Sequence, residues 1–344
     1  MTTVLRNVMA AFAASLSLPF LGVAVAFAGE GAQWRIESAD ETVRPNIPES
    51  ESLGGIVWIT NDVYWAVNDR RPVVWEMSLP VDRSNGKISG CSLRRLFDPE
   101  DSVDVEAIAL DPIDGTVWLA DEHHNRIARH DPANGRLTGE ALLPKAMQSH
   151  YPELGLESLT IDREGLVMWT CTEEALTIDG SRSTRKSGSD VRITKLHRRS
   201  ADEAWAVAGQ WIYRTDPMAG GPWYIDGCDN ARSGIAELCL LDDGSLLVLE
   251  REFSKVLIPR LRCRIYVADV SGATEVHGLA TVADAKDIKR VSKRKLYETS
   301  GFSMYEGMCL GPKLSDGATL LVLVADGDGH RALRSVMTLR LYRH

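Results

Sequence analysis

Short apolar runs recur along the chain in a pattern that repeats itself. Residues 106–111 read EAIALD, and residues 157–162 and 237–242 echo them with the same five-residue step from Glu to Asp. Two copies are looser: residues 306–311 keep the Glu, whereas residues 54–59 keep only the apolar body. Such internal similarity at spaced intervals predicts a repeat architecture.

A turn sequence and then a second apolar run follow each copy. The turns contain Asp, Asn or Gly, as at residues 111–115 and 242–244. Two apolar, β-branched or aromatic runs separated by such a turn are typical of an antiparallel hairpin. The second runs cover residues 63–67, 116–120, 166–170, 245–249 and 318–324.

One or two further alternating segments follow each hairpin, for example residues 126–130, 191–196 and 264–268. Four strands per repeat make a propeller blade. The fold class predicted is therefore an all-β propeller of five blades, with repeats starting at 54, 106, 157, 237 and 306, and the long 157–237 interval has room for a sixth. Residues 33–36 lack a hairpin partner, so this N-terminal strand is predicted to pair near residues 337–342 and close the ring.

Acidic residues mark both ends of these hairpins. The first strand starts with Glu106, Glu157, Glu237 or Glu306, and the second ends at Asp69, Asp121, Glu173, Glu250 or Asp326. Because both ends of an antiparallel hairpin lie on one edge of the sheet, we expect these carboxylates to converge at one mouth of the channel. In the first repeat Gly54 replaces the Glu, which predicts an open side beside Asp69 and Arg70.

Carboxylates gathered in this way must be protonated, pair with arginines or bind a cation. Oxygen ligands in a flexible ring suit Ca²⁺ best, with Mg²⁺ and Mn²⁺ behind it. The expected metal ligands are Glu106, Glu157, Glu237, Glu306, Asp121 and Glu250. The alternative is structural, because a repeated acid also ties strand ends together by accepting backbone N–H bonds.

Other polar residues near the hairpin ends add candidate chemistry. Glu157, Asp69 and His123 are the candidate catalytic residues, although a histidine in a loop is often just exposed. Arg70 and Arg251 are candidates for binding a substrate anion, or they neutralise neighbouring acids. Residues 326–329 (DGDG) resemble only a fragment of a calcium loop.

Several other function classes lack support in the sequence. The chain has no Gly-x-Ser-x-Gly elbow of serine esterases and no glycine-rich nucleotide-binding loop. The formal net charge is −9, and the basic residues at 182, 185 and 186 fall in a Ser/Gly-rich segment that we interpret as a solvated loop. Nucleic acid is therefore not an expected partner, because its binding needs a clustered basic face.

The first 28 residues have the layout of a secretory signal. Arg6 is followed by an apolar run that ends in Ala-Phe-Ala at residues 26–28. A membrane anchor is the alternative, since the run approaches the ~20 residues that span a bilayer, but Ser15, Ser17 and Pro19 favour cleavage. We predict a signal peptide over 1–28, a single domain over 29–344, no later membrane span, and a periplasmic or secreted location.

Six cysteines lie after this segment, at positions 91, 171, 228, 239, 263 and 309. An oxidising compartment permits disulfides, and the sequence does not choose among the 15 pairings. Cys228 and Cys239 are the closest pair in sequence, whereas Cys171, Cys239 and Cys309 fall in apolar runs that suit buried thiols. The spacing does not match a zinc site.

In this order the motifs resemble a β-propeller family, the phytase-like proteins described as "esterase-like activity of phytase". The matching segments are residues 53–56, 67–70, 105–109, 117–122, 155–159, 235–238, 246–251, 267–276 and 305–308. The resemblance implies a propeller fold and hydrolysis of phosphoesters or esters. The chain departs from the family pattern at residues 304–307 (MYEG in place of Asn-Phe-Glu-Gly) and at Ala107 and Ser158, where the family shows Gly.

The resulting hypothesis is an exported, metal-assisted hydrolase that acts on a small anionic phosphoester or ester. The glutamates would hold the cation, which polarises the substrate and activates water. The alternative is a non-catalytic propeller that binds a ligand or protein and keeps a structural cation, since no nucleophile is identified. A lactonase-like propeller would share the metal and differ in substrate.

Overall fold

The computed structural model describes residues 33–43, 52–68, 71–219, 231–254, 260–283, 285–301, 303–326 and 335–344. The chain divides into two units, Met1–Gln33 and Trp34–His344, and the strands of the described residues lie in the second. The predicted signal segment lies outside the described residues, as do Asp69, Arg70, Cys228 and residues 327–329. None of the described residues forms an apolar helix of membrane-spanning length.

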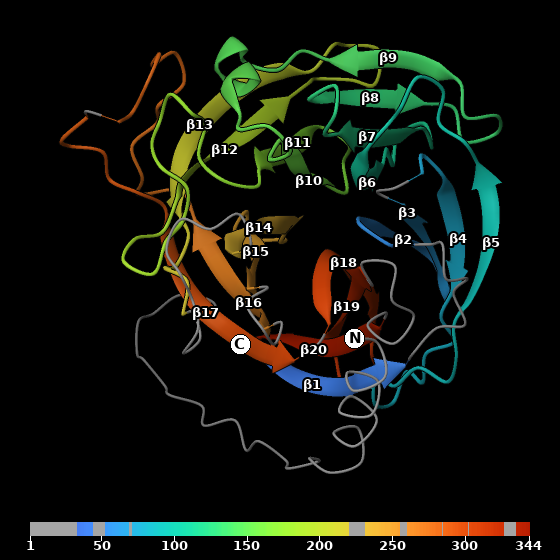
Figure 1. Cartoon of the computed structure of the whole chain (residues 1–344). Helices are drawn as coiled ribbons and strands as arrows, with labels where there is room; N and C mark the ends of the chain where they lie inside the picture. Colours follow the sequence, from blue (N-terminus) through green and yellow to red (C-terminus); the bar gives the residue numbers. More distant parts are fainter. Residues whose placement is uncertain are drawn as a thin grey trace, which may run out of the picture. The chain divides into compact units, whose positions relative to one another are not determined.

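Five four-stranded antiparallel sheets follow one another around a ring (Figure 1). Blade 1 contains β2 (Ile56–Thr60), β3 (Val63–Val67), β4 (Val74–Ser78) and β5 (Ser92–Phe97). Blade 2 contains β6 (Val105–Leu110), β7 (Val117–Asp121), β8 (Arg126–His130) and β9 (Leu137–Ala141), followed by the short 3₁₀ helix η1 (Lys145–Ser149). Blade 3 contains β10 (Leu156–Ile161), β11 (Val167–Thr172), β12 (Asp190–His197) and β13 (Ala206–Arg214).

The last two blades have longer strands. Blade 4 contains β14 (Ala231–Leu240), β15 (Leu246–Ser254), β16 (Arg260–Asp269) and β17 (Ser292–Gly301). Blade 5 contains β18 (Met304–Lys313), β19 (Thr319–Asp326), β20 (Val336–Arg343) and β1 (Trp34–Val43). The predicted five-bladed all-β propeller is therefore confirmed. The described part of the 157–237 interval contains only the four strands of blade 3, and its extra length lies in long strands and loops.

The N-terminal strand closes the ring, as predicted. β1 pairs antiparallel with β20, with Trp34 opposite Arg343 and Ile36 opposite Leu341. The first and the last strand of the chain, β1 and β20, therefore lie side by side in blade 5. In this blade β18 is the innermost strand and β1 the outermost. This pairing joins segments that are about as far apart in sequence as the chain allows, and such non-local contacts slow folding.

The hairpins form where the turn sequences predict them. Gly115 (φ 72°) and Gly244 (φ 86°) adopt left-handed backbone conformations between the first two strands of blades 2 and 4. Glycine suits these positions because it lacks the Cβ that disfavours positive φ. The Asp111 amide donates to the Thr116 carbonyl at 2.8 Å, which closes the turn in blade 2.

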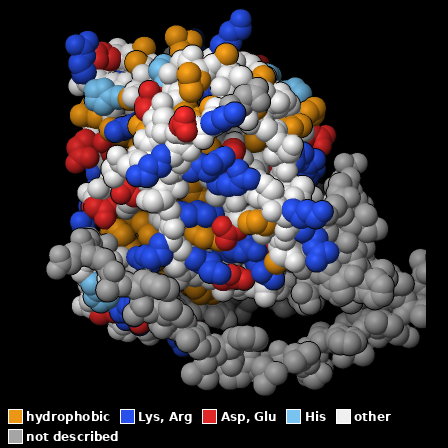
Figure 2. All heavy atoms as spheres, turned by 90° about the vertical axis from the view of Figure 1, so that its left-hand side faces the viewer, with side chains coloured by type: hydrophobic (Ala, Val, Ile, Leu, Met, Phe, Trp, Pro, Cys, Tyr) orange, Lys and Arg blue, Asp and Glu red, His pale blue; other side chains and the backbone are white. Residues whose placement is uncertain are grey.

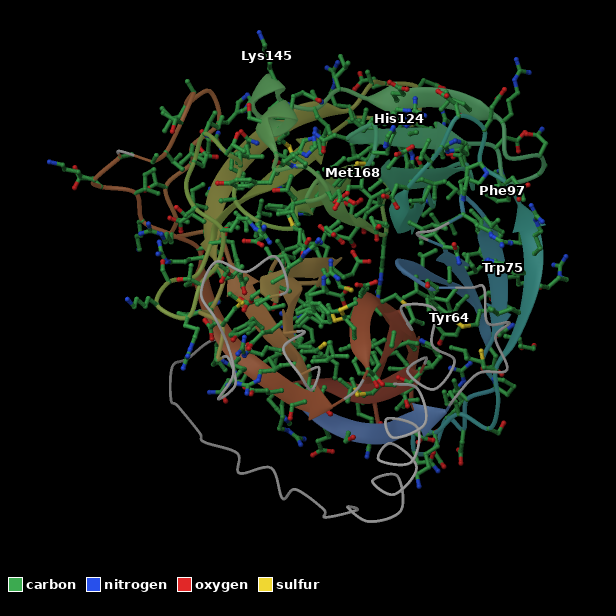
Figure 3. The ribbon with its side chains drawn as sticks, viewed as in Figure 1. Tyr64, Trp75, Phe97, His124, Lys145 and Met168 are labelled. Carbon is green, nitrogen blue, oxygen red and sulfur yellow. The ribbon has the colours of Figure 1, made fainter. Side chains whose placement is uncertain are left out.

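The apolar core lies between neighbouring blades. Trp118 and Ile127 of blade 2 pack with Met168 and Leu196 of blade 3 in one buried cluster, and Figure 3 places Met168 within the tightly filled sheet region. Sheet faces bury their side chains against each other because neither face is covered by a helix. Trp118, Trp169 and Trp205 are buried, as expected for packing between blades.

The cysteines of the described residues, Cys91, Cys171, Cys239, Cys263 and Cys309, are free thiols. Cys239 donates to the Met308 carbonyl at 3.2 Å. Cys228 lies outside the described residues, so the disulfide pairing of the chain stays open. Burial raises the pKa of Cys171 and Cys263 to about 12. They are unreactive core residues, as the apolar sequence around Cys171 suggested.

Basic side chains gather on the face that carries the outer strands of blades 3 and 4 (Figure 2). Residues 289–295 (KRVSKRK) form a basic run on and before β17 that the sequence interpretation overlooked. Its charges are partly neutralised locally: Arg290 pairs with Asp190, Lys293 with Glu250, and Lys295 with Glu298. Charged residues on an outermost strand also protect its edge against pairing with other chains.

Candidate functional site

A β-bulge marks the start of several inner strands. In blade 2, Val105 lies opposite Asp121 and Ala107 opposite Ala120, which leaves Glu106 as the extra residue. The same register shift leaves Glu157 as the extra residue in blade 3 and Glu306 in blade 5. A bulge re-aims the side chain that it displaces. Three of the predicted glutamates therefore occupy equivalent positions on the inner strands.

Blade 4 has a different residue at this position. Its register shift falls between Ile235 and Glu237, so Ala236 is the equivalent of Glu106, and the repeat proposed from sequence is out of step there by one residue. Glu237 is buried, and its Oε1 accepts hydrogen bonds from the Leu238 amide at 3.0 Å and the Leu159 amide at 3.2 Å. It ties β14 to β10, and burial raises its pKa well above the ordinary range.

Asp121 and Glu250 take part in separate hydrogen-bond networks. Asp121 accepts from the backbone amides of Val103 and His124 and lies 2.8 Å from His124 Nδ1. The two oxygens of Glu250 accept from the Tyr213 hydroxyl at 2.7 Å, Lys293 Nζ at 2.6 Å and the Asp216 amide at 3.0 Å. These contacts match the structural alternative, in which acids bind strand ends and neighbouring blades together.

The next residue along the second strand points toward the carboxylate ring. Glu122 donates its amide to the Asp104 carbonyl, Glu173 donates to the Gly155 carbonyl, and Arg251 lies opposite Gly234. Glu122, Glu173 and Arg251 are thus equivalent in blades 2, 3 and 4. Successive residues of a strand face opposite sides, so this one-residue step separates them from Asp121 and Glu250.

Arg251 binds three carboxylates from two other blades. Its Nη2 lies 3.1 Å from Glu157 Oε1 and 3.2 Å from Glu173 Oε1, and its Nη1 pairs with Glu306. The side chain is only 13 % exposed. The structure therefore favours the neutralising role for Arg251, and the substrate-binding role stays a prediction.

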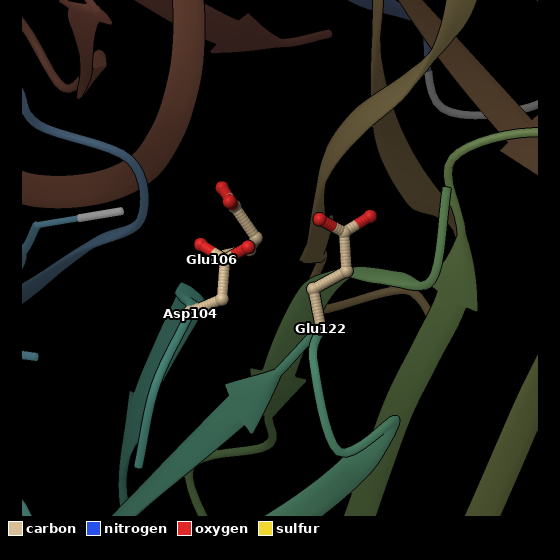
Figure 4. A group of neighbouring side chains, drawn as sticks. All are labelled: Asp104, Glu106 and Glu122. Carbon is tan, nitrogen blue, oxygen red and sulfur yellow. The ribbon is translucent and has the colours of Figure 1, made fainter. Parts of the chain in front are cut away.

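Asp104, Glu106 and Glu122 form a second group, all from blade 2. Each offers one carboxylate oxygen, and these oxygens lie within 4.8 Å of one another (Figure 4). Burial raises the pKa of Glu122 to about 7 and also raises the pKa of Asp104, while the Gly155 amide donates to Glu122 Oε1 at 2.6 Å. Carboxylates held this closely suit a divalent cation.

Buried polar atoms around the ring lack hydrogen-bond partners. Both oxygens of Glu173 are buried and accept no hydrogen bond. The Asn125 Oδ1 atom and the Ser233 hydroxyl are also buried and have no hydrogen-bond partner. Burial raises the pKa of Glu157 well above its ordinary range despite the nearby Arg251 guanidinium. Unsatisfied buried acceptors of this kind fit a bound ion or ordered water.

Two glycines make room for the acids that reach across to the next blade. A Cβ on Gly155 would lie 2.9 Å from Glu122 Cγ, and a Cβ on Gly234 would lie 2.5 Å from Glu173 Cγ. Both distances are too short for real side chains. Each glycine therefore allows a second-strand acid to pack against the start of the following blade.

His123 is exposed on the turn after β7, with its ring centroid 5.0 Å from that of His124. Its charge acts on Asp104, which places it near the blade 2 acids. His124, labelled in Figure 3, is held by Asp121 instead. The catalytic role of His123 stays a prediction.

Sequence reasoning included Glu173 in the ring, but it selected Asp121 in place of Glu122 and missed Asp104. Glu122 and Glu173 each lie in a pair of adjacent acids, and the strand alternation that selects one of the two was not resolved for blade 2. Asp104 was not considered, because its position does not carry an acid in every repeat. Blades 3 and 4 have Gly155 and Gly234 at the equivalent position. Only the paired register shows that these positions are equivalent.

Comparison with known proteins identifies the family. No curated protein matches the chain. The solved structures that resemble it include a streptogramin B lyase, with 12% identity over 90% of this chain and 98% of that chain and a TM-score of 0.35. They also include the PQQ-bound aldose sugar dehydrogenase from Streptomyces coelicolor, with 12% identity over 91% and 99% of the two chains and a TM-score of 0.44. The glutaminyl cyclase of Myxococcus xanthus shares 10% identity over 92% and 100%, with a TM-score of 0.43. The family described as "Phytase-like: Esterase-like activity of phytase" matches residues 49–329, and the chain belongs to it.

Proposed function

We propose that this protein is a metal-assisted hydrolase of small anionic phosphoesters or esters, with a divalent cation bound by blade 2 at the channel mouth. The observation that carries the proposal is the group of Asp104, Glu106 and Glu122, whose three carboxylate oxygens lie within 4.8 Å of one another. The family description, "Esterase-like activity of phytase", supports the same class of reaction.

The charge around the site favours a cation. The described residues place six carboxylates at this mouth against the single guanidinium of Arg251; they are Asp104, Glu106, Glu122, Glu157, Glu173 and Glu306. So many acids, four of them buried and two half-buried, cannot all stay ionised without further positive charge. Ca²⁺ is the preferred ion because it accepts several carboxylate oxygens in flexible geometry, whereas Mg²⁺ demands a regular octahedron.

Asp104, Glu106 and Glu122 would hold the cation, which when bound supplies Lewis acidity toward a phosphoryl or carbonyl oxygen and lowers the pKa of water. Glu157 and Glu173 are held by Arg251 and lie beyond the ligand group. His123, which is exposed on the turn after β7, stays a candidate for proton transfer. Asp69 and Arg70 follow β3 and stay candidates for substrate contact.

The test is hydrolysis of phytate and p-nitrophenyl phosphate in the presence of Ca²⁺ and after chelation. We expect turnover that chelation abolishes and that Glu106→Gln lowers by at least about tenfold, since metal sites lose roughly this much with one altered ligand or partner. Glu203→Gln is the matched control, because Glu203 pairs with Arg199 on an exposed turn. Turnover that is indifferent to chelator and to Glu106→Gln would contradict the proposal.

A non-catalytic propeller with a structural cation is the second candidate. It is favoured by the ion pairs of Arg251, which fix three of the carboxylates in place. Its signature is Ca²⁺-dependent thermal stabilisation without turnover on a broad panel of esters, lactones and phosphoesters.

Export is part of the proposal and has its own test. The apolar run and the Ala-Phe-Ala sequence at 26–28 predict cleavage before Gly29. N-terminal sequencing of the protein recovered from the periplasmic and extracellular fractions should begin at or near this residue. An uncleaved chain found only in the membrane fraction would indicate an anchor.

A further inference from the structure

Blade 4 departs from the charge pattern of the carboxylate ring at two equivalent positions. Its bulge residue is Ala236, where blades 2, 3 and 5 have glutamate. Its second-strand residue is Arg251, where blades 2 and 3 have Glu122 and Glu173. Ala236 carries no charge and Arg251 carries a positive one. Blade 4 therefore contributes a cation and no acid at these two positions.

Arg251 lies where a metal ion would otherwise meet the acids of blades 3 and 5. Its ion pairs go to Glu157 and Glu173 of blade 3 and to Glu306 of blade 5. A planar guanidinium with several N–H groups can bind such a set from one place, and it remains charged at every accessible pH. Met304 Sδ, 3.8 Å from Nη1, also contacts this guanidinium.

The acids around Arg251 retain capacity for another ligand. Both oxygens of Glu173 are buried and accept no hydrogen bond, although Oε1 lies 3.2 Å from Arg251 Nη2. The ionised form of a carboxylate as buried as this one is strongly disfavoured, because few hydrogen bonds or ion pairs compensate for its lost hydration. Glu173 is held in place by its electrostatic attraction to Arg251. A ligand that bound its oxygens more closely would stabilise the carboxylate more.

We propose that Arg251 is a fixed internal cation that fills the blade 3 and blade 5 half of the ring and restricts the mouth to one divalent cation, at Asp104, Glu106 and Glu122. The inference rests on the proposed function, in which blade 2 holds that cation. It makes Arg251 a specificity-determining residue, because it sets how many ions the ring accepts. Without its charge, Glu157, Glu173 and Glu306 become a second site for a divalent cation.

Calcium titration of the full chain tests this inference by isothermal calorimetry, with Tb³⁺ luminescence as an independent reading of ion number. We expect about one ion per chain for the wild type and about two for Arg251→Gln, given the oxygen ligands freed on blades 3 and 5. Arg251→Lys keeps the positive charge and should bind one ion. Arg264→Gln is the matched control: it removes another buried arginine of blade 4, which pairs with Glu252, and should also leave one ion.

Thermal unfolding supplies a second reading. In chelator, Arg251→Gln should melt below the wild type because three buried acids lose their partner, and Ca²⁺ should restore its melting temperature by more than it raises that of the wild type. Arg251→Lys should fold with or without calcium. Failure of Arg251→Gln to fold even in Ca²⁺ would overturn the inference, since the ion is expected to replace the guanidinium.

The outcomes separate the inference from the proposed function. Binding of one ion that Glu106→Gln abolishes, together with one ion of unchanged affinity in Arg251→Gln, overturns the role of Arg251 and leaves the blade 2 site intact. A wild-type protein that binds no Ca²⁺ and no Tb³⁺ overturns both.

Discussion

Individual residues in this propeller act through charge pairs that differ greatly in burial. Arg198 and Arg199 are neighbours in sequence, yet Arg198 pairs with Asp111 of blade 2 at 2.5 Å with a side chain 1 % exposed, whereas Arg199 pairs with Glu203 and is 83 % exposed. Arg198 Nε also donates to the Gly165 carbonyl at 2.8 Å. Arg198 therefore joins two blades, whereas Arg199 lies exposed on a turn.

Replacing Arg198 should therefore destabilise the fold far more than replacing Arg199. Arg198→Met leaves Asp111 as a buried, uncompensated acid, and breaking such a pair costs about 3–5 kcal/mol. Arg199→Met should change the free energy of unfolding by less than about 1 kcal/mol, as for other exposed pairs. Urea denaturation of the two variants makes the comparison, and equal losses would show that the buried pair contributes no more than an exposed one.

At the scale of strands, β-bulges and pairing register decide which acids form the ring. Glu106, Glu157 and Glu306 are the bulged residues of their first strands. The second strands add Glu122, Glu173 and Arg251, which occupy one equivalent position in blades 2, 3 and 4. A shift by one residue would turn each of these side chains to the other face of its sheet. The site is thus a property of strand pairing as much as of the residues.

The pairing of β1 with β20 is the element on which closure depends. Removing residues 34–43 would expose the edge of β20 and the apolar side chains that β1 covers, including the partners of Trp34 and Ile36 in the buried cluster between blades 4 and 5. An open edge of this kind promotes association between chains. We expect the truncated chain to unfold at a lower temperature and to aggregate.

Scanning calorimetry and light scattering check this expectation, with a truncation that ends before Gln33 as the control. A chain without β1 that stays monomeric and melts like the control would show that the ring does not need this strand.

At the scale of the whole molecule, buried acids make stability depend on pH. Burial raises the pKa of Glu122 and of Glu174 to about 7, against an ordinary value of 4.5, and it also raises the pKa of Glu157 well above the ordinary range. Between about pH 4.5 and 7 the folded protein therefore holds protons that the unfolded chain has released. His130, whose pKa burial lowers, acts in the opposite direction, but it is one group against several.

The sign follows from this difference in bound protons. The stabilisation from the raised pKa values is present at low pH and is lost as the pH rises through about 7, so the chelated protein should be most stable near pH 5 and less stable at pH 8. Saturating Ca²⁺ should reduce the loss, since the ion favours ionised ligands. Urea midpoints across this range provide the measurement, and a midpoint that increases toward pH 8 in chelator would contradict the expectation.

The sequence by itself determined the propeller fold, the five repeats, the hairpins and the closing strand, because alternation with period two and turn residues are local signals that each blade repeats. The structure decided that the described part of the 157–237 interval adds no sixth blade. It also showed that acids recur at the hairpin ends and that Glu106 and Glu306 belong to the set. Only the tertiary structure decided which acids meet. The bulge at Ala236 moved Glu237 out of the ring, the alternation after β7 and β11 selected Glu122 and Glu173, and the ring brought Arg251 between blades 3 and 5. These contacts join residues up to 94 positions apart, and a one-residue step in register, which leaves the apolar pattern nearly unchanged, reverses the direction in which a charged side chain points.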